Sequence, residues 1–287
     1  MKQILLTGSS SGFGFLTFKT LAAQGHTVYA TMRNINGANA TSAKEIRDWA
    51  TANKAKVEVV ELDVTSETSV NTAVATILKQ SGGKLDVLIN NAGLSFLGIT
   101  ETLSNEQTNQ LFQVNVIGAD RVIKAVLPTM REQKSGLIIN VTSVQARLHI
   151  PIFTTYNATK VALDALTVGY HYELRSFGID VVALQPGAYN TTDIVTKAIQ
   201  PANPAIEKEY GEDMLKVKEW LTQLFTPGEN SQNPQEVANK LLDLVNAPKG
   251  SNPLWTPIGT PLASYLDKIN QDTQVLAETV LTSIGAL

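Results

Sequence analysis

The sequence contains no cysteine, and this absence removes several kinds of chemistry. Disulfides, a catalytic thiolate and cysteine-ligated zinc all require that residue. Histidine is scarce too: only His26, His149 and His171 occur, and they are too widely spaced to predict a local metal site. No metal is therefore expected, and the lack of cysteine is consistent with a cytoplasmic protein.

Excess charge and long apolar runs are lacking as well. The 23 Lys and Arg against 26 Asp and Glu leave a formal net charge of −3, which offers no basic surface to a nucleic acid. No stretch reaches the roughly 18 apolar residues that predict a membrane span. The first strand also begins too early to leave room for a secretory signal. Neither a nucleic acid nor a membrane is expected as a partner.

The apolar residues that are present alternate between strand-like and helix-like patterns. They make up 43% of the 287 residues, enough for a sizeable core. The strand candidates lack strict alternation, which is typical of parallel strands covered on both faces. The sequence thus predicts an α/β fold with a doubly wound parallel sheet. Strands are expected at residues 3–6, 27–31, 57–62, 87–90, 136–142 and 180–185, and helices near 13–24, 42–53, 67–80, 104–131, 156–177, 206–225, 234–246 and 262–284.

A glycine-rich turn separates the first predicted strand from the first predicted helix. Its glycines allow a tight turn and a close approach to a pyrophosphate, and the helix N-terminus offers free N–H groups to phosphates. A plain tight turn uses the same residue types and is the alternative. The residues expected to bind the nucleotide here are Gly8, Ser10, Ser11, Gly12, Phe13 and Gly14.

A second group of residues lies in the middle of the chain. Tyr156 and Lys160 are spaced Tyr-x-x-x-Lys, and Ser143 precedes the tyrosine by thirteen residues. With the string Asn90-Asn91-Ala92-Gly93, with Asn115 and with the Gly-x-x-x-Gly-x-Gly turn, they resemble the single-domain branch of the short-chain dehydrogenase/reductase family. Within that family the chain resembles the steroid- and retinol-dehydrogenase-like and carbonyl reductase subgroup.

This resemblance carries motifs from residue 1 to about residue 187 and continues more loosely to the C-terminus. It implies a Rossmann-type sheet of about seven strands, the last an edge strand within residues 253–259, in one catalytic domain spanning residues 1–287. Residues 188–233, which are rich in proline, asparagine and glutamine, are interpreted as an insertion that covers the substrate site. The family commonly forms dimers or tetramers, so the resemblance is compatible with a homodimer or homotetramer, and the sequence leaves the oligomeric state open.

The Tyr-x-x-x-Lys spacing places both side chains on one face of a helix. A free tyrosine has a pKa of about 10, and lowering it to about 7 requires roughly 4 kcal/mol of preferential stabilisation of the phenolate. We expect the Lys160 ammonium to supply much of that. The resemblance implies that Tyr156 is the general acid/base, that Ser143 hydrogen-bonds the substrate carbonyl and that Lys160 also holds the nicotinamide ribose. It further implies that Asn115 holds a water linking Lys160 to solvent, the alternative being a buried packing residue.

The resemblance also implies further contacts to a dinucleotide. Asp63 and Val64 match the adenine site, Asn90, Ala92 and Gly93 the adenosine ribose site, Pro186 and Gly187 the nicotinamide turn, and Thr191 a hydroxyl beyond it. The residue at the end of the second strand distinguishes NAD from NADP, because an acid at that position would bind the ribose 2′-hydroxyl of NAD. Instead Arg33 stands there, and it can pair with a 2′-phosphate with Ser11 close by. NADP(H) is therefore expected, although an exposed surface arginine is the alternative.

The substrate is expected to be a hydrophobic ketone or secondary alcohol, because the residues near the predicted site are mostly apolar. The pocket candidates are Phe96, His149, Phe153 and Tyr189, and Trp220 and Phe225 are candidates for the covering segment. Some of these residues fit simple packing equally well. Two rival functions remain: a catalytically silent NADP-sensing or scaffold protein on the same fold, and an epimerase or dehydratase of the extended branch. The intact Ser143, Tyr156 and Lys160 argue against the first, and the glycine spacing argues against the second.

Overall fold

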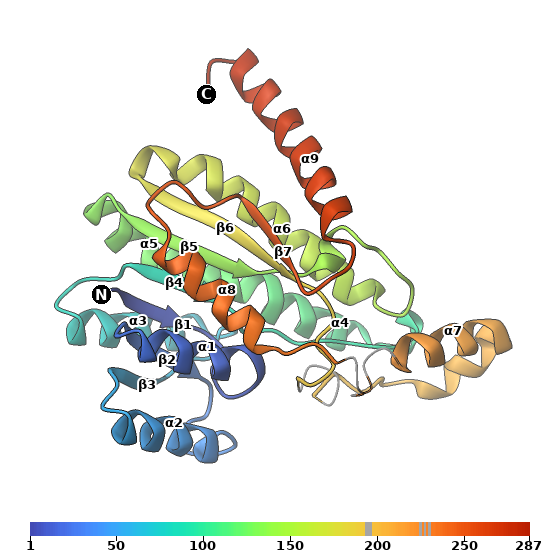
Figure 1. Cartoon of the computed structure of the whole chain (residues 1–287). Coiled ribbons are helices and arrows are strands. Elements are labelled where there is room, and N and C mark those ends of the chain that lie inside the picture. Colours follow the sequence, from blue (N-terminus) through green and yellow to red (C-terminus); the bar gives the residue numbers. More distant parts are fainter. Residues whose placement is uncertain (193–196, 224–225, 227, 229–230) are drawn as a thin grey trace.

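The computed structural model describes residues 1–192, 197–223, 226, 228 and 231–287. Within them, seven parallel strands form one sheet in the order β3-β2-β1-β4-β5-β6-β7 (Figure 1). The predicted parallel sheet is confirmed, including the edge strand. The strands are β1 (Gln3–Leu6), β2 (Thr27–Met32), β3 (Val57–Glu61), β4 (Val87–Asn90), β5 (Gly136–Val141), β6 (Ile179–Pro186) and β7 (Trp255–Ile258).

Helices cover both faces of this sheet. One apolar cluster joins α1, α2 and α8 to one face, and a second joins α3, α5 and the C-terminal end of α6 to the other. The central strands are apolar on both sides because both faces are buried, which explains why they show no alternation. The helices are α1 (Gly12–Ala23), α2 (Ala40–Ala52), α3 (Glu67–Gln80), α4 (Asn105–Phe112), α5 (Gly118–Gln133), α6 (Thr154–Leu174), α7 (Gly211–Gln223), α8 (Gln235–Asn246) and α9 (Ala263–Ser283).

The long helix expected over residues 104–131 is interrupted. A π-helical segment, Gln113–Ile117, separates α4 from α5, so the hydrogen-bond register shifts at this point. Such a shift is common at functional sites because it reorients a side chain within an otherwise regular helix. Here it contains Asn115, which is 1% exposed and turns inward. The interruption was not predicted because the apolar pattern continues through it.

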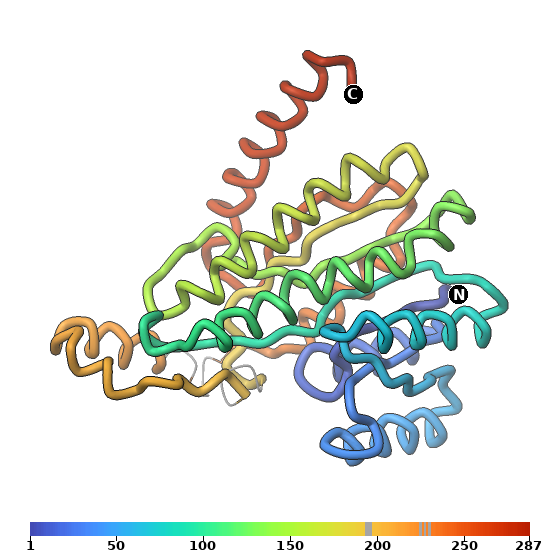
Figure 2. Tube along the Cα trace, turned by 180° about the vertical axis from the view of Figure 1, so that it is seen from behind, coloured from blue at the N-terminus to red at the C-terminus, as the bar shows by residue number. Residues whose placement is uncertain are grey.

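Two elements extend from the body of the molecule on different sides. The helix α9 projects away from the body of the molecule, and the C-terminus lies at its outer end (Figure 1). The helix α7 extends from the side of the molecule at which the carboxyl ends of the strands lie (Figures 1 and 2). A 3₁₀ segment, Pro204–Tyr210, precedes α7, where the sequence predicted the start of a regular helix. Among the residues described, no helix combines the length and apolar character needed to cross a bilayer.

Candidate active site

A cavity of about 740 Å³ lies at the carboxyl ends of the strands. Residues that follow β1, β2, β3, β4, β5 and β6 all contribute to its lining. The strand order reverses between β1 and β4, and open α/β sheets bind ligands at such a switch point. The cavity therefore lies where the fold itself predicts a binding site.

The glycine turn forms one wall of the cavity, and its glycines are required by close contacts. Gly8 has φ +70°, and a Cβ on it would lie 2.8 Å from the Cα of Ala92. A Cβ on Gly14 would lie 2.2 Å from the Gly8 carbonyl oxygen. The side chain of Asn91 holds the turn, donating to the carbonyls of Thr7 and Gly8 at 2.9 and 3.0 Å. The turn is thus fixed with the N-terminus of α1 facing the cavity.

Ser143, Tyr156 and Lys160 line the same cavity. Ser143 follows β5, where its Oγ accepts a hydrogen bond of 3.1 Å from the Gln145 backbone N–H. Tyr156 and Lys160 share one face of α6, with the ammonium 5.6 Å from the centre of the phenol ring. Lys160 Nζ also donates to the carbonyl of Val141 at 2.9 Å, which ties α6 to the end of β5.

The protonation behaviour of this pair differs from the expectation. Burial raises the pKa of Tyr156 to about 12, and its hydrogen bond with Ser143 opposes that rise only in part. Burial also lowers the pKa of Lys160 to about 8. Both shifts have one cause, since a low-dielectric environment disfavours phenolate and ammonium alike. The neutral phenol is therefore stabilised in the folded chain, and the expected lowering of its pKa by Lys160 is wrong for the protein alone.

Asn115 lies outside the cavity lining, between the loop after β4 and α6. Its Oδ1 accepts from the backbone N–H of Leu94 at 2.7 Å, and its Nδ2 donates to the Leu94 carbonyl and to Oγ1 of Thr159, at 2.8 and 3.0 Å. The side chain thus joins the loop after β4 to α6. A place in a proton relay stays a prediction for this residue.

Most of the residues selected from the sequence meet in the cavity. Of those selected, the lining contains Gly8, Ser10, Ser11, Gly12, Phe13, Arg33, Asp63, Val64, Ala92, Gly93, Ser143, Phe153, Tyr156, Lys160, Pro186, Gly187 and Tyr189. Residues separated by more than a hundred positions in the chain therefore meet at one site, as the family resemblance implied. Gly14, although outside the lining, supports the turn from behind.

Two residues selected from the sequence, Asn90 at the end of β4 and Phe96 in the loop after it, lie outside the cavity lining. Asn90 is buried in the sheet, where its Nδ2 donates to Oδ1 of Asn140 at 2.9 Å. It stabilises the sheet centre, and its neighbour Asn91 faces the cavity instead. Phe96 is fully buried against Leu103 and Leu111, so it is a packing residue and not part of the substrate pocket.

The pocket and lid candidates need similar corrections. His149 is exposed and absent from the cavity lining, as is Thr191, whose Oγ1 donates to the Gln232 carbonyl at 3.4 Å while Thr192 lines the cavity. Trp220 is 61% exposed on α7. Phe225 lies outside the described residues.

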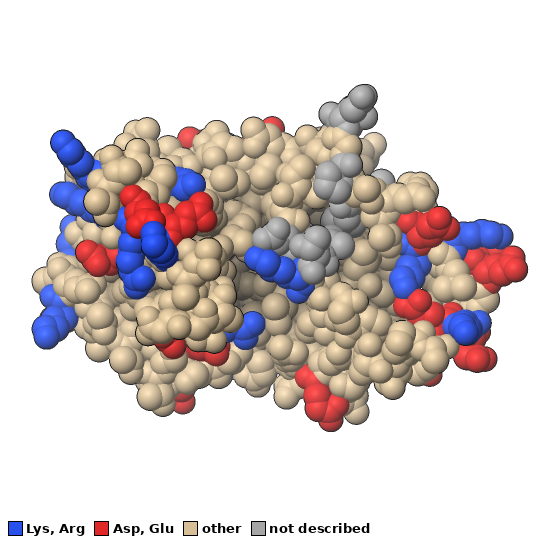
Figure 3. Space-filling view, turned by 90° about the horizontal axis from the view of Figure 1, so that it is seen from below, with Lys and Arg blue, Asp and Glu red and all other residues tan. Residues whose placement is uncertain are grey.

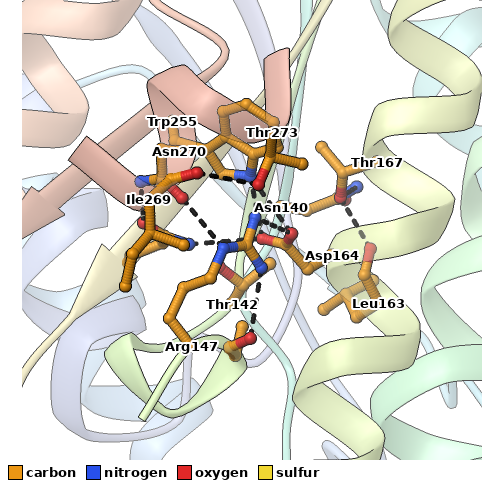
Figure 4. A network of polar contacts seen from close by, with 12 residues as sticks. Asn140, Thr142, Arg147, Leu163, Asp164, Thr167, Trp255, Ile269, Asn270 and Thr273 are labelled. Carbon is orange, nitrogen blue, oxygen red and sulfur yellow. Dashed lines mark hydrogen bonds and ion pairs between the residues drawn. The ribbon is translucent and has the colours of Figure 1, made fainter. Parts of the chain in front are cut away.

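One positioning feature was missed by sequence reasoning, a buried polar cluster between α6, β6, β7 and α9 (Figure 4). Arg147 Nη2 and Asp164 Oδ2 form an ion pair of 2.8 Å, with side chains 13% and 4% exposed. The indole Nε1 of Trp255 donates to both Asp164 oxygens, at 3.0 and 3.1 Å. Asn270 accepts from Arg147 Nε at 3.0 Å and donates to Gln185 at 2.8 Å. We call these five residues the Arg147 cluster.

The Arg147 cluster connects the segments that carry Ser143, Lys160 and the Pro186-Gly187 turn. Arg147 lies one short turn after Ser143, and Asp164 lies one helical turn after Lys160. Gln185 directly precedes the Pro186-Gly187 turn, and Asn270 comes from α9. In the sequence, the Arg147 cluster is indicated only by the four-residue spacings of Arg147 from Ser143 and of Asp164 from Lys160. Its partners from β7 and α9 are too distant in the chain to be recognised.

Positive charge dominates the cavity. Among its described lining residues, Arg33, Lys160 and Lys197 are cationic, and Asp63 is the acid. Figure 3 shows Lys and Arg side chains beside a hollow on the face viewed from below. Within the part of the chain that the structure describes, no three His, Asp or Glu side chains are grouped to hold a metal ion. The lining suits an anionic ligand with an apolar portion.

Comparison with known proteins assigns the chain to a family. A family model described as short chain dehydrogenase matches residues 2–203. The chain is 37% identical over 188 residues to the 3-ketodihydrosphingosine reductase of Bacteroides thetaiotaomicron, covering 66% of this chain and 64% of that protein. It is 30% identical over 257 residues to human 17-beta-hydroxysteroid dehydrogenase type 1, covering 86% of this chain and 74% of that protein. The chain belongs to the short-chain dehydrogenase family, a family of oxidoreductases.

A solved structure agrees with this assignment. The alcohol dehydrogenase from the archaeon Thermococcus sibiricus, complexed with 5-hydroxy-NADP, is 25% identical and superposes with a TM-score of 0.70. The match covers 90% of this chain and 96% of that one. The likeness thus extends over the segments after residue 203, where the family model no longer matches.

Proposed function

We propose that this oxidoreductase transfers a hydride between NADP(H) and a hydrophobic ketone or secondary alcohol, with Tyr156 as the acid/base. The observation that carries the proposal is the joint placement of the glycine turn, Ser143, Tyr156 and Lys160 around one cavity. A protein that only sensed the nucleotide would need none of the side chains of Ser143, Tyr156 and Lys160 in the same cavity as the glycine turn.

The residues present fit a nicotinamide dinucleotide. A side chain on Gly8 or Gly14 would clash with Ala92 or with the Gly8 carbonyl, at 2.8 and 2.2 Å, so the glycines keep the turn tight beside the N-terminus of α1, where backbone N–H groups can bind a phosphate. Asp63, Val64, Ala92 and Gly93 are placed to line the adenosine portion, and Pro186 and Gly187 the nicotinamide portion. When bound, the cofactor supplies or accepts the hydride. Everything else in the reaction is provided by the chain.

The proton is assigned to the phenol oxygen of Tyr156. Burial keeps this group neutral, with its pKa raised to about 12, so in reduction it donates its proton to the substrate carbonyl oxygen. Ser143 hydrogen-bonds the same oxygen from the end of β5 and so fixes its position. Lys160, held by the Val141 carbonyl, places positive charge beside the phenolate that results.

The preference for NADP over NAD rests on the end of β2. No acid stands at that position, and the exposed Arg33 lines the cavity there. A guanidinium pairs with a phosphate through two parallel hydrogen bonds, which favours a ribose that carries a 2′-phosphate. The similar archaeal structure contains an NADP derivative, which supports this choice.

The substrate class follows from the apolar wall next to the phenol. Leu97, Ile150 and Phe153 line the cavity there, and Leu221 of α7 packs in the same cluster as Tyr156. The segment 188–233 thus contributes to the substrate side, consistent with its interpretation as a cover. The two relatives are named for a keto compound and a hydroxysteroid, which agrees with a hydrophobic substrate.

The test is a Tyr156→Phe variant assayed with NADPH and ketones of graded size. Loss of the proton donor should reduce kcat by a factor of about 10² to 10⁴, because general acid catalysis contributes about that much. The Kd for NADPH, measured by quenching of the reduced cofactor's fluorescence, should stay within about twofold of wild type, which separates catalysis from binding. A variant as active as wild type refutes the assignment of Tyr156. A wild type that binds NADPH but reduces no ketone in the panel supports the silent sensor instead.

A further inference from the structure

Lys197, which the sequence analysis did not select, lies beside the glycine turn. Its Nζ donates a hydrogen bond of 3.0 Å to Oγ of Ser11, although the two residues are 186 positions apart. Both side chains line the cavity. The backbone close to Lys197 is anchored, since the N–H of Ile199 donates to the Ser95 carbonyl at 2.9 Å. A cation from the segment after β6 is therefore held at the turn where phosphate is expected.

The same segment contacts the turn at two other points. The rings of Phe13 and Tyr189 meet edge to face, with centroids 5.2 Å apart. A Cβ on Gly12 would lie 3.9 Å from the Cβ of Thr192, which is ordinary van der Waals contact. The described part of this segment thus lies against the glycine turn, and residues of both line the cavity.

The electrostatics at this point favour an anion. The helix α1 begins at Gly12, so its N-terminus carries partial positive charge, and the Lys197 ammonium at Ser11 adds a full positive charge at the same point of the cavity. Ser11 occupies the cap position, yet its side chain makes no capping hydrogen bond. Its hydroxyl accepts from Lys197 and retains its own hydrogen for a ligand.

We infer that Lys197 binds the pyrophosphate of the dinucleotide, facing the backbone N–H groups of the glycine turn. This inference rests on the proposed function, since it requires a dinucleotide in the cavity. Lys197 meets Ser11 at the start of α1, whereas Arg33 follows β2, so the two cations serve different phosphates. Arg33 contacts the 2′-phosphate, and Lys197 contacts the pyrophosphate. Lys197 is then a part of the cofactor site that comes from the described residues after β6.

The test measures dissociation constants by isothermal titration calorimetry for ADP, 2′-AMP, NADH and NADPH. Lys197→Gln removes the charge and keeps most of the side chain, and losing one charge-assisted hydrogen bond should weaken ADP, NADH and NADPH by about tenfold each. Binding of 2′-AMP should not change, while Arg33→Gln should weaken only 2′-AMP and NADPH. Lys197→Arg should retain affinity, and Lys208→Gln, an exposed lysine of the 3₁₀ segment outside the cavity lining, is the matched control.

The salt dependence of the ADP dissociation constant gives a readout that a structural role would not affect. It should become shallower in Lys197→Gln, because one screened charge contact is gone. If wild type binds NADPH and Lys197→Gln binds ADP and NADPH equally well, this inference is overturned and the proposed function stands. A loss confined to 2′-AMP and NADPH also overturns it, since Lys197 would then serve the 2′-phosphate. If wild type binds neither NADH nor NADPH, the proposed function fails and the inference fails with it.

Discussion

Removing one partner of the Arg147 cluster should be among the most damaging single changes in this fold. Arg147→Met deletes the guanidinium and keeps a side chain of similar length. Asp164, 4% exposed, would keep its hydrogen bonds from Trp255 but lose its counter-charge. Leaving a buried charge unpaired costs about 3–5 kcal/mol. We therefore expect the free energy of unfolding to fall by about that amount.

The assay is urea denaturation followed by circular dichroism, applied to a double-mutant cycle. Asp164→Leu alone should also destabilise strongly, because Arg147 is then the unpaired charge. The double variant Arg147→Met/Asp164→Leu should be more stable than the sum of the single effects predicts, by about 1–3 kcal/mol, since no buried charge remains. The exposed pair Lys44 and Asp48, with side chains 76% and 62% exposed, is the control. Lys44→Met should cost less than about 1 kcal/mol.

Two results would refute this reasoning. Single variants that lose less than about 1 kcal/mol would show that the pair behaves like a surface ion pair. Strictly additive effects in the double variant would show that Arg147 and Asp164 do not depend on one another, and the ion pair would then not hold the Ser143 loop to α6.

Two further predictions follow from the site itself. Lys160→Met should abolish turnover yet raise the unfolding free energy at pH 7. In the folded chain the pKa of Lys160 is lowered from 10.5 to about 8, so the unfolded chain binds the proton more tightly. Below pH 8 the buried ammonium therefore lowers the free energy of unfolding by about 3 kcal/mol. The variant regains this amount, minus the contribution of the lost hydrogen bond to the Val141 carbonyl. The native lysine deprotonates above that pH, so the gain should shrink toward pH 10, and a gain that does not depend on pH would contradict it. Gly14→Ala should lower the unfolding free energy by about 1–3 kcal/mol and weaken NADPH binding, because its Cβ would lie 2.2 Å from the Gly8 oxygen. Gly169→Ala, with nothing within 4 Å, should not destabilise, and equal effects in both would disprove the steric argument.

The sheet could be predicted because burial on both faces leaves a direct mark on composition. A strand such as β5 needs apolar side chains at nearly every position, and that pattern is visible without knowing its partners. The shared position of Tyr156 and Lys160 in the cavity could be predicted for a related reason. Residues four positions apart share one face of a helix, so the spacing alone places Tyr156 and Lys160 side by side.

The placement of the other residues around the site depends on tertiary contacts, which the spacing of residues in the sequence does not encode. Asn90 and Asn91 are adjacent and identical, and only the phase of β4 decides that the first is buried while the second holds the glycine turn. Phe96 looked like a pocket residue, yet the loop after β4 turns it inward. Asn270 and Lys197 are distant from their partners in the chain, so no local pattern identifies them.

The shifted pKa values of Tyr156 and Lys160 bear on the direction of the proposed reaction. Burial stabilises neutral Tyr156, and a neutral phenol is the form that donates a proton to a carbonyl. Oxidation of an alcohol requires the phenolate instead, and the same burial opposes it. Lys160, with its pKa lowered to about 8, loses part of its charge in the alkaline range where phenolate would otherwise form. The environment of α6 therefore stabilises the protonated phenol near neutral pH, which is the form that the proposed reduction requires.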